Sequence, residues 1–113
     1  MVDTSLNYKP IEIAHQPPLV PEGDGARVQR ALGIAKLRTL DPFLMLDVFR
    51  STLPAGFPDH PHRGFETVTY VMKGSVVHED FKGHAGTINE GDVQWMTAGR
   101  GIMHSEMPGS FTE

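Results

Sequence analysis

Residues 60–70 of the chain read His60-Pro-His-Arg-Gly-Phe-Glu-Thr-Val-Thr-Tyr70. His60 and His62 are two residues apart, so both side chains would lie on the same face of an extended strand. Pro61 favours that geometry, because a residue that precedes proline is pushed away from helical backbone angles. Proline also lacks a backbone donor, which places the pair at the start of a strand, at a sheet edge or at a bulge.

A second pair with the same spacing, His104 and Glu106, lies near the end of the chain. Two neighbouring strands that carry such pairs would direct three imidazoles and one carboxylate at one point. An isolated His-x-His pair is more often a surface or core feature, but two matched pairs in a β-rich chain favour a metal site. Three nitrogens and one oxygen suit iron, with nickel, copper, manganese or zinc as alternatives.

Short apolar runs separated by turn residues predict an all-β sandwich or barrel. The 12 glycines and 9 prolines fall largely between these runs, and no stretch keeps a 3.6-residue apolar period. We expect a loop from Pro17 to Gly25 and a two-residue hairpin turn at Gly74-Ser75, with Val76–Phe81 returning along the preceding strand. The predicted strands are Ile11–Ala14, Ala26–Leu32, Phe43–Phe49, Thr67–Lys73, Val76–Phe81, Val93–Met96 and Ile102–Met107.

The composition narrows the class of protein. A chain of 113 residues suits one domain, which we assign to residues 1–113, with residues 1–24 as an extended segment and early strand. A net charge of −4 gives no basic footprint for direct nucleic-acid binding, and the absence of cysteine excludes disulfides and thiolate metal sites. No apolar run approaches the roughly 20 residues that span a bilayer. The polar start lacks the apolar core of a signal peptide, so we expect an intracellular protein without membrane contact, cytoplasmic or, in a eukaryote, nuclear.

Three further charged residues lie close to the two pairs. Glu66 has the same sequence parity as both histidines before it, so it is either a ligand, a group that orients an imidazole, or an acid that faces solvent. Arg63 and Arg100 flank the pairs and either bind an anionic substrate, contact the metal-bound carboxylate or are simply solvated. The histidines without a partner at ligand spacing, which we interpret as surface or packing residues, are His15, His78 and His84.

The segments His60–Tyr70 and Gln94–Pro108 closely resemble the two cupin motifs of the pirin family, within the cupin superfamily. The resemblance runs from about Gly25 to Pro108 and implies a cupin-type (jelly-roll) β-barrel. Further stretches that follow the pirin pattern are Leu40-Asp-Pro-Phe-Leu44, Gly56-Phe-Pro-Asp-His60, His78-Glu-Asp-Phe81, Gly83-His84 and Gly91-Asp92.

The resemblance also implies a ligand set and two activities. By this resemblance, the positions of the pirin iron ligands are occupied by His60, His62, His104 and Glu106. Glu66 occupies a position that binds metal in many cupins but not in pirins. Pirins are associated with quercetin 2,3-dioxygenase activity, in which Glu106 would be both a ligand and the base that takes a proton from the flavonol. They are also associated with an iron-dependent, non-enzymatic role as nuclear transcriptional co-regulators, which makes a protein-binding module the alternative. A third alternative is a remnant that retains little or no metal.

The chain departs from the family pattern at its end. Pirins are longer and carry two cupin domains packed face to face, whereas this sequence stops at Glu113. We therefore expect a barrel that is incomplete at its C-terminal end, with an exposed strand edge available for pairing with another chain. The expected outcome is either a homodimer formed through that edge, with or without exchanged strands, or a truncated product, together with a site more open to water than in a complete pirin.

Overall fold

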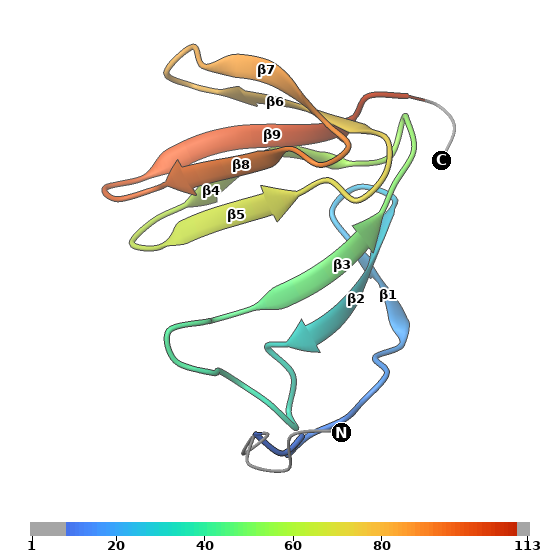
Figure 1. The fold of residues 1–113 in the computed structure, drawn as a ribbon. Helices are drawn as coiled ribbons and strands as arrows, with labels where there is room; N and C mark the ends of the chain where they lie inside the picture. The colour runs from blue at the N-terminus through green and yellow to red at the C-terminus, as the bar shows by residue number, and fades with distance from the viewer. Residues whose placement is uncertain (1–8, 111–113) are drawn as a thin grey trace, which may run out of the picture.

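A computed structural model describes residues 9–110 of the chain as an all-β protein (Figure 1). The predicted extended segment 1–24 therefore lies partly outside the described residues. No helix among those residues is long and apolar enough to cross a membrane. The strands are β1 Leu19–Glu22, β2 Ala26–Leu32, β3 Leu46–Arg50, β4 Phe57–His62, β5 Glu66–Tyr70, β6 Ser75–Asp80, β7 Ala85–Asn89, β8 Val93–Thr97 and β9 Ile102–Pro108.

The strands form three antiparallel sheets with the orders β1-β2-β3, β4-β9-β6-β7 and β5-β8. In Figure 1, β5 and β8 lie in front of the four-stranded sheet, and the three-stranded sheet lies below them. Within residues 9–110, β3 pairs only with β2, and β5 pairs only with β8. The predicted all-β class is confirmed, and the barrel is not closed.

The core lies where the sheets meet. Val71, Val76 and Ile88 form a buried cluster, and Phe49 of β3 packs against it. The ring of Phe49 also meets the ring of Phe57 edge to face, with 5.3 Å between the centroids. Edge-to-face pairs add to the burial of apolar area, so these rings fasten β3 of the three-stranded sheet to β4, which carries two of the histidines.

Two features stabilise the three-stranded sheet: the alternation of buried and exposed side chains along its strands, and an ion pair. Val28 on β2 is buried and lies opposite Phe49 on β3. Arg30, two residues further along β2, binds both carboxylate oxygens of Asp47 on β3 at 2.9 and 2.8 Å. A third bond joins Arg30 to Glu22 on β1, so one guanidinium links all three strands.

The strand predictions were wrong at the N-terminal end. Ile11–Ala14 lies outside any strand, whereas β1 forms at Leu19–Glu22, within the expected loop. Gln29 of β2 donates to the carbonyl of Pro17 at 3.1 Å, which holds the chain beside β2 just before β1. Pro21 is tolerated there because β1 is the edge of its sheet and an edge strand leaves one row of amides unpaired.

The predicted hairpin between the strands near residues 70 and 76 is also wrong. β6 pairs with β7 and β9, and not with β5. The backbone of Val71 instead bonds to the turn before β8. The Val71 N–H donates to the carbonyl of Asp92, and the Val71 carbonyl accepts from the N–H of Gly91. The chain therefore crosses from one sheet to another at this point. β7 was missed altogether, because Ala85–Asn89 contains one glycine and a single β-branched apolar residue.

Candidate metal centre

The pairing of β4 with β9 brings the three predicted histidines together. His60 lies directly opposite His104, and His62 lies opposite Ile102. Directly opposed residues of an antiparallel pair share a face, and so do residues two apart on one strand, which places all three rings on one side. The ring centroids are 4.5 to 4.9 Å apart, and one ligand atom from each ring lies within 4.8 Å of the other two. The three imidazoles can therefore hold one metal ion.

The local sequence of β4 orients the first imidazole. The register with β9 shifts between Phe57 and His60, at a stretch that contains Pro58. His60 Nδ1 lies 2.8 Å from the carbonyl oxygen of Pro58. Because a carbonyl oxygen only accepts, Nδ1 carries the proton and donates it, which leaves Nε2 with a free lone pair. A backbone carbonyl that fixes the tautomer of a histidine in this way is a common support for metal ligands.

His104 is the most enclosed member of the group. Its side chain is only 2% exposed, and neither ring nitrogen has a hydrogen-bond partner among the described residues. A buried polar atom without a partner is destabilising, and a metal ion would supply the missing partner for one nitrogen. Burial lowers the pKa of His104, with Glu106 opposing that shift, and burial followed by the proximity of His60 lowers the pKa of His62. Both shifts favour the neutral imidazole, which is the form that binds metal.

Glu106 lies beside the three imidazoles and is held from the facing sheet. Thr69 Oγ1 of β5 donates to Glu106 Oε1 at 2.9 Å, and Glu106 Oε2 lies 3.9 Å from His104 Nε2. The carboxylate thus has one oxygen engaged and the other next to the most buried imidazole. The ligand atoms that lie within 4.8 Å of one another come from the three histidines, and Glu106 lies beside this group.

The structure does not bring Glu66 to the histidines. Thr97 Oγ1 donates to Glu66 Oε1 at 2.9 Å, on the strand opposite. Alternate residues of a strand point to opposite faces, and Thr69 points to the face that meets Glu106. Glu66, three residues before Thr69, therefore points the other way. Of the alternatives considered for this residue, the structure favours the acid that faces away from the site.

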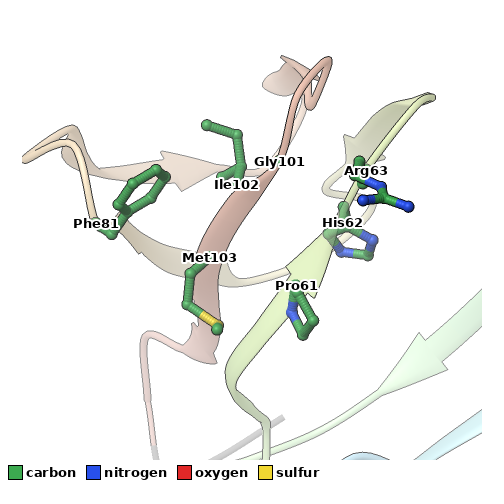
Figure 2. A pocket seen from close by; sticks show the side chains of 7 residues that line it. All are labelled: Pro61, His62, Arg63, Phe81, Gly101, Ile102 and Met103. Atoms are coloured by element: carbon green, nitrogen blue, oxygen red, sulfur yellow. The ribbon is translucent and has the colours of Figure 1, made fainter.

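The two arginines lie in the loops that follow β4 and precede β9, beside a pocket on the face of these strands that carries Pro61 and Met103. Arg63 is exposed and follows His62 at the rim of an open pocket of about 470 Å³, also lined by Phe81 and Met103 (Figure 2). Arg100 is exposed in the turn between β8 and β9. The neighbouring Gly99 carbonyl accepts from Gly64 N–H at 2.9 Å, so the loops that carry the two arginines are joined. Both guanidinium groups are thus available to an anion from solvent.

Sequence reasoning missed two residues near the site. His78 on β6 is the register partner of Glu106, so the two side chains share a face. A Cβ at Gly86 would lie 3.2 Å from His78 Nε2, which shows that the ring occupies the space above that glycine. The two-residue spacing of His78 and Asp80 repeats that of the ligand pairs and could have pointed to this strand. Nothing in the sequence singles out Thr69.

The family model described as Pirin matches residues 25–113. The chain belongs to the pirin family. It is 70% identical to a pirin-like protein of Solanum lycopersicum over 87 residues, which cover 77% of this chain and 30% of that protein. It is 64% identical to human pirin over 88 residues, with the same two shares. The chain thus spans about 30% of the length of these curated pirins.

The fold matches solved structures as well. A crystal structure of a quercetin 2,3-dioxygenase from Acinetobacter baumannii superposes with a TM-score of 0.74 at 31% identity, covering 86% of this chain and 34% of that one. The expected cupin-type fold is therefore confirmed, with the barrel left open. The match covers all four predicted ligand positions, since they lie within the residues of the family model.

Proposed function

We propose that this pirin domain binds iron through two histidines of β4 and the His-x-Glu pair of β9. The observation that carries the proposal is the buried ring of His104, whose two nitrogens lack hydrogen-bond partners among the described residues while two further imidazoles lie beside it. The donor set of three neutral nitrogens and one carboxylate oxygen suits iron, and nickel, copper, manganese and zinc remain alternatives. The proposed ligands are His60, His62, His104 and Glu106.

The proposed chemistry is that of a quercetin 2,3-dioxygenase acting on a flavonol or a similar small aromatic molecule. Support comes from the quercetin 2,3-dioxygenase of Acinetobacter baumannii, which has the same fold. When bound, the metal ion would supply Lewis acidity and redox activity at the point where the imidazoles converge. Glu106 would be both a ligand and the acceptor of the substrate's hydroxyl proton, and both roles would fall to Oε2, since the Thr69 hydrogen bond engages Oε1. Arg63 and Arg100 would attract the resulting anion.

The second candidate is a non-enzymatic, iron-dependent module that binds a protein partner, such as a transcriptional co-regulator. The observation in its favour is the apolar outer face of the β5-β8 sheet, where Val68, Tyr70 and Trp95 are 53%, 60% and 65% exposed. Contiguous exposed apolar side chains of this size mark interaction surfaces in soluble proteins. In this role the metal ligands would be the same, and the partner would respond to the redox state of the bound iron.

Anaerobic iron loading followed by an oxygen-uptake assay with quercetin separates the two candidates. His62→Ala should lose bound iron and oxygen uptake together, whereas His84→Ala should keep both, because His84 lies in an exposed turn. Iron retention without flavonol-dependent oxygen uptake would favour the binding module. Failure of the unaltered chain to retain any of the five metals would contradict both candidates.

We also propose that residues 1–113 act as one domain and that two copies associate through the open strand edge. An exposed edge is a template for pairing with another strand, and both β3 and β5 present one. Sedimentation of the full chain over a range of concentrations tests this association. An intracellular location, cytoplasmic or nuclear, is part of the same proposal, and direct nucleic-acid binding is not, given the net charge of −4.

A further inference from the structure

The sheet formed by β5 and β8 carries polar side chains on its inner face and apolar side chains on its outer face. Thr69 points inward, since it bonds to Glu106 of the facing sheet. Alternation and register then give the other inward-pointing side chains, which are Thr67, Gln94 and Met96. The outward-pointing side chains are apolar and each more than half exposed, namely Val68, Tyr70, Val93 and Trp95. An antiparallel sheet that covers a core shows the opposite pattern. The inner face of this sheet therefore suits a polar occupant and not an apolar core.

Four polar side chains cross the two facing sheets in one row. Gln94 on β8 lies directly opposite Thr69 on β5. Thr69 donates to Glu106 on β9 at 2.9 Å, and Glu106 lies directly opposite His78 on β6. Directly opposed residues of an antiparallel pair are neighbours on one face. Gln94 and His78 are thus the two ends of a row whose middle is the hydrogen bond that holds the proposed carboxylate ligand.

The two ends of the row have hydrogen-bonding capacity that the protein does not use. Neither the Gln94 amide nor the His78 ring has a hydrogen-bond partner within residues 9–110. Both side chains are half-buried, so they are partly withdrawn from water and still open to a small molecule. A polar group in this position gains from a ligand that supplies a partner. An amide offers both a donor and an acceptor, and so does a neutral imidazole, which suits the hydroxyl groups of a ligand.

The ring of His78 owes its space to Gly86 on β7. Gly86 lies directly opposite His78, and a Cβ there would be 3.2 Å from His78 Nε2. The φ angle of Gly86 is not positive, so its backbone does not require glycine. The missing side chain instead leaves room for the imidazole on the inner face. Burial is the largest cause that lowers the pKa of His104, and His78 adds to that shift, which places the His78 ring near the metal centre.

We propose that His78 and Gln94 bind hydroxyl groups of the substrate that do not reach the metal, and thereby select hydroxylated aromatic molecules over unsubstituted ones. The inference rests on the proposed function and names residues that set its specificity. Because Gln94 belongs to one sheet and His78 to the other, the two contacts fall on opposite sides of the bound molecule. They orient it so that its acidic hydroxyl lies at Glu106, in the middle of the row.

Two flavonols separate this role from metal binding. 3-Hydroxyflavone carries the hydroxyl and carbonyl groups that bind a metal ion, and quercetin carries further hydroxyl groups on its other rings. We expect the unaltered chain, titrated anaerobically and followed by ligand absorbance, to bind quercetin more tightly than 3-hydroxyflavone. His78→Leu and Gln94→Leu should each weaken quercetin binding by about threefold to tenfold, the order of one hydrogen bond, and leave the binding of 3-hydroxyflavone unchanged.

The matched controls are His15→Leu and Gln16→Leu, because both positions are exposed and lie outside any strand. Both should leave the two affinities unchanged. Gly86→Ala keeps His78 but displaces its ring, so it should also weaken quercetin binding and spare 3-hydroxyflavone. Equal weakening of both flavonols by the variants at positions 78 and 94, or no weakening of either, would overturn the inference. An unchanged quercetin affinity in Gly86→Ala would overturn the part assigned to His78.

Running the titrations on both the manganese-loaded and the metal-free chain keeps this inference distinct from the iron site. A chain that retains manganese but binds the two flavonols equally would refute the hydroxyl contacts and leave the metal proposal standing. A chain that retains no metal, yet prefers quercetin in a way that His78→Leu and Gln94→Leu abolish, would contradict the metal proposal alone. The absence of a quercetin preference in both states would refute the inference.

Discussion

Thr69 and Glu106 join two sheets through a single 2.9 Å hydrogen bond. Thr69 lies on β5 of the two-stranded sheet, and Glu106 lies on β9 of the four-stranded sheet. The proposed carboxylate ligand is therefore positioned by a strand that carries none of the other ligands. Its orientation depends on how the two sheets face each other.

Replacing Thr69 with valine removes the donor and keeps the shape of the side chain. We expect the affinity for iron or manganese to fall by about tenfold, the lower end of what the loss of a ligand-supporting hydrogen bond produces. Anaerobic calorimetric titration measures the change. Thr67→Val is the control, because Thr67 lies on the same face of β5 and is the register partner of Met96. Equal affinities for the two variants would show that Thr69 has no part in the site.

Replacing His104 with leucine should separate stability from metal binding. The metal-free protein should become more stable by about 1–3 kcal/mol, because two buried nitrogens without partners are replaced by apolar carbon. The variant should gain no further stability when metal is added. Thermal unfolding with and without manganese gives both quantities. A metal-free variant less stable than the parent would show that the ring packs too well to be replaced.

The stability of the metal-free chain should depend on pH through the same histidine. Burial lowers the pKa of His104 from its ordinary value of 6.5 in the folded protein. The unfolded chain therefore binds a proton in a pH range just below 6.5 where the folded chain does not, and acidification through that range favours unfolding. Urea unfolding between pH 7.5 and 5 measures the slope. His104→Leu should flatten the curve, and His15→Leu, at an exposed position, serves as the control.

Replacing Arg30 with methionine tests the three-stranded sheet. The guanidinium contacts both carboxylate oxygens of Asp47, whose side chain is only 14% exposed. Without it, a mostly buried carboxylate loses its partner, and we expect a loss of about 1–2 kcal/mol in the free energy of unfolding, discounted for the partial exposure of Arg30. Arg27 on the same strand is exposed, so Arg27→Met should change the free energy of unfolding little. Urea unfolding at neutral pH compares the two.

The sequence predicted the convergence of the three histidines better than it predicted the strand pairing. The i, i+2 parity of His60 and His62 and of His104 and Glu106 needs only extended backbone, which Pro61 and the β-rich composition favour. The pairing of β5 with β8 could not be predicted in this way, because a turn signal at Gly74 shows where a chain reverses and not which strand it then meets. Local propensity also failed at Ile11–Ala14, where an apolar alternation has no partner strand among residues 9–110.

His60 and His104 are neighbours across β4 and β9, although β5, β6, β7 and β8 lie between them in the chain. A contact between segments so far apart in sequence forms slowly, because the intervening chain must first be ordered. A metal ion held by both strands would therefore act on the finished structure more than on its assembly. It would slow the separation of β4 from β9 and extend the lifetime of the folded state while leaving the rate of folding almost unchanged.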